Sequence, residues 1–108
     1  MDKKLVLQAK KHDKEAFVKL VENYQVSMYK TAIAILQNDE DAADAIQETI
    51  LICWEKIGSL RNAKFFKTWM TRILIHRCYA IYNENKRTVT ADSFPDVMDL
   101  SLIHISEP

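Results

Sequence analysis

Apolar residues recur at intervals of three and four along most of the chain, the spacing that places them on one face of an α-helix. The first such stretch is short and covers Lys3–Lys11. A second begins after Asp13, a residue suited to N-capping, and runs to about Leu36. Its inward positions are expected to be Phe17, Leu20, Val21, Tyr24, Met28, Ala32 and Ile35. The pattern therefore predicts a short helix followed by a long one.

Two more helices are predicted in the second half of the chain. Asn38 or Asp39 can cap the first of them. Its inward stripe is expected to be Ala43, Ile46, Ile50, Cys53, Trp54 and Ile57. Gly58 follows the last apolar position, where a left-handed C-cap residue is expected. After a polar loop at Ser59–Lys64, the last helix should run from about Phe65 to Lys86. Its inward residues are expected to be Phe66, Trp69, Met70, Ile73 and Ile81.

The length of 108 residues, with one Gly and two Pro, favours a single domain of long helices with few turns. We predict an all-α fold, a compact bundle of three long helices plus a short N-terminal helix. The bundle is expected to occupy residues 1–87. Residues 88–99 lose the helical periodicity, turn acidic and include Pro95, so they should begin a linker.

The last nine residues, 100–108 (LSLIHISEP), look like the translation of a transposase sequencing adapter. We interpret them as a non-native tail, with a native strand-like tail as the alternative. His104 is therefore given no role.

The formal net charge of zero conceals two blocks of opposite sign. Residues 38–55 carry six acids and no base (−6), and residues 56–87 carry eight bases and one acid (+7). Such blocks can form two faces for different partners. Alternatively, they only solvate their helices and attract each other.

Signals of an enzyme, a metal site or a membrane segment are lacking in the sequence. His12, His76 and His104 lie on different predicted elements, without a second His or Cys at ligand spacing. No Gly-rich loop could hold a phosphate. We therefore expect no enzyme, no catalytic residue, no metal and no cofactor. The rival is a carboxylate–metal bundle on the acidic helix, although no Glu-x-x-His motif accompanies those acids.

No apolar run approaches about 18 residues, so no membrane partner is expected. Cys53 and Cys78 lie within apolar helical patterns and read as small core residues of a reducing compartment. The expected localisation is cytoplasmic.

The loop at Ser59–Lys64 and the helix after it combine cations with aromatic rings. The cations are Arg61, Lys64, Lys67, Arg72, Arg77, Lys86 and Arg87, with Phe65, Tyr79 and Tyr82 between them. Cations contact phosphates, aromatic faces receive unstacked bases, and a polar loop at a helix N-terminus suits capture of a flipped base. Composition alone leaves nucleic-acid binding and a merely solvated face as open alternatives.

Three motifs in order resemble the extracytoplasmic-function (group IV) sigma factors of the sigma-70 family. HDKEAF at His12–Phe17 resembles their first conserved element, and DAADAIQETILICW at Asp41–Trp54 resembles their core-binding segment. FKTWMTRI at Phe66–Ile73 resembles the opening of their promoter −10 helix. The resemblance extends over residues 5–87 and indicates region 2 of such a factor.

The resemblance implies two sets of functional residues. Asp41, Asp44, Gln47 and Glu48 would bind the clamp helices of the largest subunit of RNA polymerase core. The loop at Ser59–Lys64 would capture an extruded base of the non-template strand of the −10 element. The DNA-binding residues implied in total are Arg61, Asn62, Lys64, Lys67, Thr68, Arg72, His76, Lys86 and Arg87.

Two departures from the family pattern stand out. Many members have Arg and Asn where this chain has Ile75 and His76. Primary sigma factors have adjacent aromatic residues where this chain has Trp69 and Met70, which implies weaker strand wedging and stricter promoter choice. Whether Trp69 is a core residue or a base wedge is left open by the pattern.

The resemblance thus implies a binding module that docks on polymerase core and captures the melted −10 element. An anti-sigma factor is a further expected partner. The family's −35-binding domain is expected to follow the linker, so we expect this chain to be truncated at its C-terminus. The alternative is a regulatory helical bundle that binds polymerase without binding DNA.

Overall fold

The computed structural model describes residues 2–89, with side chains described as far as Asn85. The helices are α1 (Lys3–Lys10), α2 (Lys14–Leu36), α3 (Asp39–Lys56) and α4 (Phe66–Val89), with two short 3₁₀ helices, η1 (Ile57–Ser59) and η2 (Ala63–Phe65), between α3 and α4. No strand occurs between residues 2 and 89. The prediction of an all-α bundle of three long helices and a short N-terminal one is confirmed.

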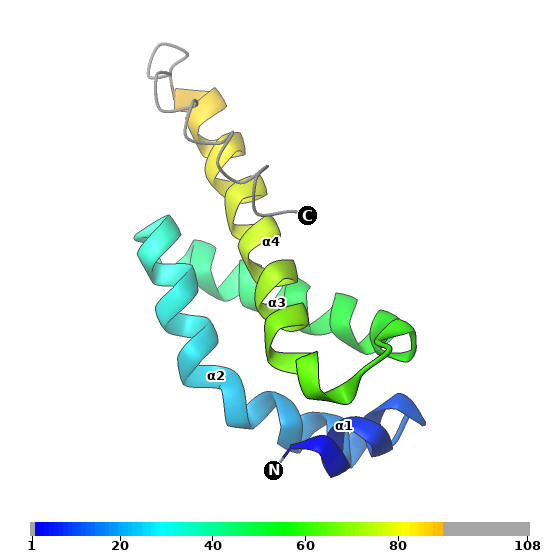
Figure 1. The fold of residues 1–108 in the computed structure, drawn as a ribbon. Helices are drawn as coiled ribbons and strands as arrows, with labels where there is room; N and C mark the ends of the chain where they lie inside the picture. The colour runs from blue at the N-terminus through cyan, green and yellow to red at the C-terminus, as the bar shows by residue number, and fades with distance from the viewer. Residues whose placement is uncertain (1, 90–108) are drawn as a thin grey trace.

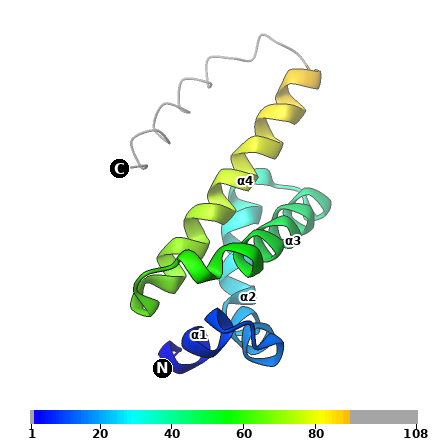
Figure 2. The ribbon, with the colours of Figure 1, turned by 90° about the vertical axis from the view of Figure 1, so that its right-hand side faces the viewer.

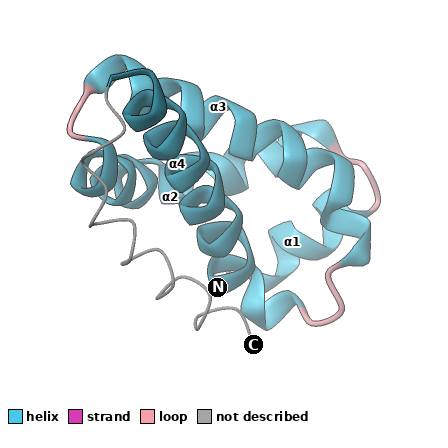
Figure 3. Cartoon of the chain, turned by 90° about the horizontal axis from the view of Figure 1, so that it is seen from above, coloured by secondary structure: helices cyan, strands magenta, loops and turns pink. Residues whose placement is uncertain are grey.

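The three long helices pack against one another in pairs, and α1 packs against α2 (Figure 1). Helix α4 crosses α3, and its C-terminal end extends beyond the other helices (Figure 2). Short loops join consecutive helices (Figure 3). Helix α1 also contacts η1 and η2. The N-terminal helix therefore lies beside the α3–α4 connection. Lys10 Nζ donates a hydrogen bond of 2.5 Å to the carbonyl oxygen of Leu60 in that connection.

Side-chain caps begin α2 and α3. Asp13 accepts a hydrogen bond from the Ala16 N–H at 3.2 Å, and Asn38 accepts one from the Asp41 N–H at 2.8 Å. Each cap satisfies an N–H that has no partner within the helix. Gln37 ends α2 in the left-handed region, with φ of 53°, and donates its N–H to the Ile33 carbonyl. The N-caps predicted for α2 and α3 are confirmed.

The core draws on all four helices. Its largest fully buried side chains are Val6, Leu20, Met28, Thr49, Cys53, Ile57, Phe66, Met70, Leu74 and Cys78. The buried Thr49 hydroxyl donates to the Ala45 carbonyl at 2.7 Å, which satisfies this polar group. Ring contacts add to this packing, because the ring of Trp54 meets His12 at 5.2 Å and Phe17 at 5.0 Å between centroids.

The inward stripe predicted for α3 is partly wrong. Cys53 and Ile57 are buried as expected, but Ala43 is exposed, and Ile46, Ile50 and Trp54 are only half-buried. The buried face instead includes Ala42, Ala45 and Thr49. Because α3 packs against both α2 and α4, it turns its small residues toward them, where the backbones approach closely. The larger isoleucines lie at the margin.

The stripe predicted for α4 is nearer the observed one. Phe66 and Met70 are buried, whereas Trp69, Ile73 and Ile81 are half-buried against the core. The predicted stripe omitted Leu74 and Cys78, which are both fully buried on this face of α4.

The connection between α3 and α4 differs from the predicted polar loop with a left-handed Gly58. Gly58 lies in η1, and no glycine of the described residues has a positive φ. Helix α3 tightens into a 3₁₀ turn instead, which the Leu60 N–H closes on the Ile57 carbonyl at 3.1 Å. Leu60 and Ala63 are 7% and 9% exposed, so two apolar side chains anchor this segment.

Element ends differ from the predicted ones by a few residues. Helix α1 ends at Lys10, and α4 begins at Phe66 and continues to Val89. The linker predicted from residue 88 is therefore helical at its first two positions. Its remainder, the tail at 100–108 and the side chains of Lys86 and Arg87 lie outside the described residues.

Cys53 and Cys78 are free and buried, as the sequence predicted. Burial raises the pKa of the Cys53 thiol to about 12 and that of the Cys78 thiol to about 11. Both thiols are therefore protonated near neutral pH, which makes them weak nucleophiles. No helix in residues 2–89 combines the length and apolarity needed to cross a membrane.

Gly58→Ala is expected to stabilise the fold. No atom lies within 4 Å of a Cβ added at this position, and the unfolded chain would lose conformational freedom, a gain of about 0.4–1 kcal/mol. Urea unfolding followed by circular dichroism should show a higher midpoint with an unchanged slope. Gln37→Gly is the matched control, because it introduces a glycine where the backbone is left-handed and should relieve the strain of a side chain in that conformation. A lower midpoint for Gly58→Ala would contradict this expectation and would indicate that Gly58 adopts the left-handed C-cap conformation predicted from the sequence.

Candidate functional site

The acidic surface, which we define as Asp41, Asp44, Gln47 and Glu48, lies on the N-terminal part of α3. Asp44 and Gln47 are exposed, and the other two are half-buried. The first turn of α3 also contains Asp39 and Glu40, where negative charge is favoured by the helix dipole. The side chains predicted to bind polymerase thus share one helix, and two of them are exposed.

Two members of the acidic surface join α3 to α4. Both Nε and Nη2 of Arg77 lie 2.8 Å from Oε1 of Glu48, and the two side chains are 37% and 46% exposed. Asn85 donates to a carboxylate oxygen of Asp41 at 2.9 Å. Asp41 and Glu48 of α3 therefore lie beside the middle and the C-terminal part of α4. These contacts were not predicted, because the partners are 29 and 44 residues apart.

An apolar groove of about 360 Å³ borders the acidic surface between α2 and α3. It is lined by Gln25, Tyr29, Asp39, Ala43, Ile46, Gln47 and Ile50. Tyr29 donates to Asp39 at 2.6 Å, and this hydrogen bond raises the pKa of the exposed phenol. The groove was missed in the sequence because the predicted stripe assigned Ala43, Ile46 and Ile50 to the core.

The basic surface follows the α3–α4 connection and the outer side of α4. It consists of Arg61, Asn62, Lys64, Lys67, Thr68, Arg72 and His76, and all seven are exposed. Within residues 2–85 none of its cations forms an ion pair, because the ion pair shown there joins Arg77 to Glu48. All the predicted DNA-binding residues whose side chains are described are therefore accessible, and the acids of α3 leave the basic surface unneutralised.

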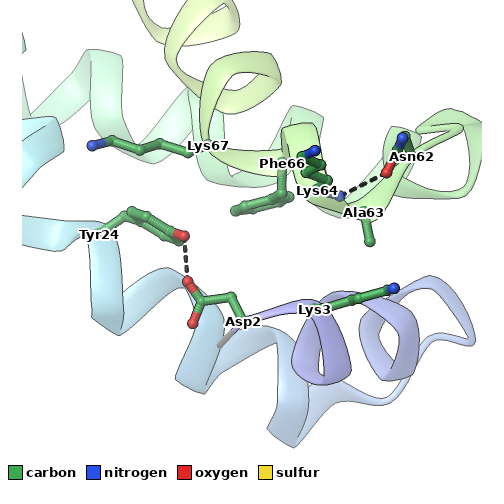
Figure 4. A pocket seen from close by; sticks show the side chains of 8 residues that line it. All are labelled: Asp2, Lys3, Tyr24, Asn62, Ala63, Lys64, Phe66 and Lys67. Carbon is green, nitrogen blue, oxygen red and sulfur yellow. Dashed lines mark hydrogen bonds between the residues drawn. The ribbon is translucent and has the colours of Figure 1, made fainter.

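A pocket of about 500 Å³ lies between α1 and η2, within the range of about 300–1,000 Å³ typical of ligand sites. We call it the α1–η2 pocket. It is lined by Asp2, Lys3, Tyr24, Asn62, Ala63, Lys64, Phe66 and Lys67. Figure 4 shows Asp2 and Lys3 on one side, facing Ala63, Lys64 and Phe66 across the opening, with Tyr24 and Lys67 toward one end.

Polar contacts hold the walls of this pocket. The Tyr24 hydroxyl donates to one carboxylate oxygen of Asp2, and the Asn23 amide donates to the other at 3.3 Å. Burial, together with the contact to Asp2, raises the pKa of Tyr24 to about 12. Across the pocket, the Asn62 side chain accepts from the Lys64 N–H at 3.0 Å and so caps η2. The Tyr24 and Phe66 rings lie 5.7 Å apart.

Some residues of the pocket were predicted for the site and others were not. Asn62, Lys64 and Lys67 were among the predicted DNA-binding residues. Asp2 and Lys3 carried no signal in the sequence, since only the fold brings α1 beside a segment about sixty residues away. Trp69 is half-buried, with its ring 5.9 Å from that of Phe66, so it packs at the edge of the core. Within the described part of the chain, no group of three His, Cys, Asp or Glu side chains is placed to hold a metal ion.

Comparisons with known proteins agree on one family. Residues 20–88 match the family model described as Sigma-70 region 2. The ECF RNA polymerase sigma factor SigW of Bacillus subtilis is 34% identical over 73 residues, which cover 68% of this chain and 39% of that protein. The RNA polymerase sigma-H factor of Pseudomonas aeruginosa is 31% identical over 75 residues, covering 69% of this chain and 39% of that protein.

A third relative, the RNA polymerase sigma factor SigV of Bacillus subtilis, is 23% identical over 86 residues, which cover 80% of this chain and 52% of that protein. The chain thus spans about two fifths to one half of the length of these curated relatives. No solved structure gives a significant match.

Tyr24 is expected to make the fold less stable at alkaline pH. Its pKa rises from 10.0 to about 12 in the folded state. Because the folded state holds the phenol proton more tightly, this contribution is fully present below pH 10 and is lost between pH 10 and 12. Urea unfolding at both ends of that window should therefore show a smaller alkaline loss of stability in Tyr24→Phe than in wild type. Tyr79→Phe serves as the control, and equal losses in Tyr24→Phe and wild type would contradict the role of Tyr24.

Proposed function

The chain belongs to the sigma-70 region 2 family, of the extracytoplasmic-function type, and we propose that it docks on RNA polymerase core and captures the melted promoter −10 element. Membership rests on the family match over residues 20–88 and on the named relatives. The observation that supports the mechanism is the separation of charge along α4. Its middle and C-terminal part, at Arg77 and Asn85, is contacted by the acidic helix, whereas Lys67 and Arg72, nearer its N-terminus, have no ion-pair partner within residues 2–85.

Docking would combine the acidic surface with the apolar groove beside it. Exposed charge pairs contribute little by themselves, typically about 0–1 kcal/mol. The half-buried Ile46 and Ile50 in the groove can add the burial of apolar area that a stable interface needs. A partner helix with a basic rim and apolar ridge fits this combination. On the strength of the family resemblance, we propose the clamp helices of the largest polymerase subunit as that partner.

Capture of DNA would combine the basic surface with the α1–η2 pocket. Lys64 and Lys67 line the pocket and belong to the basic surface, so phosphates on either side of an extruded base can reach a cation. The half-buried Tyr24 ring provides an aromatic face for that base, and stacking contributes about 1–3 kcal/mol per base. Capture stabilises the melted state by binding energy alone, so we propose a binding module and not an enzyme.

Two further features belong to the same proposal. Polymerase acts in the bacterial cytoplasm, where we expect this chain to act as well. An anti-sigma factor would cover the acidic and basic surfaces until the factor is released.

Replacing Lys64, Lys67 and Arg72 by Ala together should weaken binding of −10 single-stranded DNA in the presence of polymerase core. Loss of three phosphate contacts should reduce the slope of log affinity against log salt by about 2. Fluorescence anisotropy of a labelled non-template strand, titrated at several salt concentrations, measures both quantities.

The matched control replaces Lys14, Lys19 and Lys30, three exposed lysines of α2, by Ala, and should leave both quantities near the wild-type values. An unchanged affinity and salt slope in the Lys64, Lys67 and Arg72 variant would instead support the regulatory bundle that binds polymerase without DNA. Circular dichroism establishes that both variants are folded.

Asp44→Lys should reduce the amount of polymerase core retained in a pull-down, because it places a cation on the surface proposed to meet a basic partner. Glu48→Lys should do the same, but it also breaks the ion pair with Arg77 and costs stability. Asp44→Lys is therefore the cleaner test. Glu15→Lys, on α2, is the charge-matched control and should retain core normally. Full retention by Asp44→Lys would mean that the docking surface lies elsewhere.

A further inference from the structure

The outer side of α1 carries positive charge that the proposed capture of a base does not use. Residues 3–14 contain five lysines and one acid. One of these lysines, Lys10, is turned inward and donates to the backbone of the α3–α4 connection. Lys3, Lys4 and Lys11 are exposed. The fold thus uses one lysine of α1 as an internal donor and leaves three at the surface.

The three exposed lysines share one side of the helix. At about 100° per residue, Lys3, Lys4 and Lys11 fall within an arc of about 100°, with Leu7 between them. The Leu7 side chain is 45% exposed, so no other part of the described chain covers this side of α1. The helix rises about 12 Å from Lys3 to Lys11. We call these four residues the α1 face.

The acids at the two ends of α1 are engaged elsewhere. Asp2 accepts hydrogen bonds from Tyr24 and from a second side chain of α2. Asp13 accepts from the Ala16 N–H and so caps α2. Among the described side chains, none forms an ion pair with a lysine of the α1 face. A cationic surface without an internal counter-charge attracts an anionic partner.

The α1 face is continuous with the basic surface through the α1–η2 pocket. Lys3 belongs to the α1 face and also lines the pocket, together with Lys64 and Lys67 of the basic surface. Figure 4 shows Lys3 on the α1 side of the opening and Lys64 on the opposite side. A strand held at the basic surface can therefore extend from the cations of η2 and α4 to those of α1. This continuity favours the same strand as the partner over a separate acidic protein.

We propose that the α1 face binds phosphates of the captured single strand beyond the segment held at the basic surface. This inference rests on the proposed function, because the strand must first lie on the basic surface. It extends the DNA contact to α1, which precedes residues 20–88 matched by the family model. At about 3.4 Å per phosphate, 12 Å of helix spans roughly three or four phosphates of one strand. Such contacts add affinity without reading sequence.

The test compares labelled oligodeoxythymidines of about 6 and about 16 nucleotides, a short probe and a long one. Anisotropy titrations at several salt concentrations use the chain bound to polymerase core, with core alone as background. Replacing Lys4 and Lys11 together by Ala removes two phosphate contacts, so the salt slope of the long probe should fall by about 1.4. Its affinity should fall roughly 10-fold at low salt, and that of the short probe should stay within about 2-fold of wild type. Lys3 is left in place because it also lines the pocket.

Two control variants separate a local contact from the loss of net charge. Replacing Lys19 and Lys30, two exposed lysines of α2, by Ala removes an equal charge and should leave both probes near the wild-type values. Replacing Lys4 and Lys11 by Arg keeps the charge and should retain the affinity for the long probe. Circular dichroism establishes that each variant is folded.

An unchanged affinity of the Lys4 and Lys11 alanine variant for the long probe, or an equal loss for both probes, would overturn the proposal. A loss of polymerase retention by this variant in a pull-down without DNA would also overturn it, because the α1 face would then meet an acidic protein surface. The proposed function fails separately, if the Lys64, Lys67 and Arg72 variant keeps its affinity for the short probe. The short probe therefore tests capture, and the long probe tests the α1 face.

Discussion

The position of the acidic half of α3 along α4 is the constraint on which the charge distribution of this molecule depends. Glu48 pairs with Arg77 at the middle of α4, and Asp41 accepts from Asn85 nearer its C-terminal end, so both contacts lie beyond Lys67 and Arg72. Lys67 and Arg72, nearer the N-terminus of α4, have no ion pair with any side chain in the described range of residues 2–85. A chain with a net charge of zero thereby keeps a cationic surface and an acidic surface apart.

Helix α1 has a structural role that its length does not suggest. It is only eight residues long, yet it contributes Val6 and Ala9 to the core and contacts both 3₁₀ helices. The hydrogen bond from Lys10 to the Leu60 carbonyl fixes one end of the α3–α4 connection, while Asp2 and Lys3 form the facing wall of the pocket. Helix α1 thus packs against the α3–α4 connection and helps to order this segment, which the sequence predicted to be a polar loop.

The sequence predicted best those features that depend on neighbouring residues. Caps at Asp13 and Asn38 follow from short polar side chains that reach their own helix N-terminus. Periodicity located the helices but misplaced the buried face of α3, because it weights Ile46 above Ala45 although close packing favours the smaller residue. Gly58 misled for a related reason, since α3 ends through a 3₁₀ turn that any residue can adopt. Asp2 and the Arg77–Glu48 pair depend on tertiary contacts and had no local signal.

The free energies of base extrusion and base stacking explain why the pocket and the basic surface would have to act together. Removing a base from a duplex costs a few kcal/mol in lost stacking and pairing, and stacking on an aromatic wall returns about 1–3 kcal/mol. A pocket alone therefore does little more than offset the cost of extrusion. The additional stabilisation must come from phosphate contacts, which depend on salt but not on sequence. Lys64 and Lys67 belong both to the pocket and to the basic surface, so under the proposed function a base would enter the pocket while its backbone lies on these cations. In the proposed arrangement, the sequence-independent electrostatic attraction would act at the position where a base is captured.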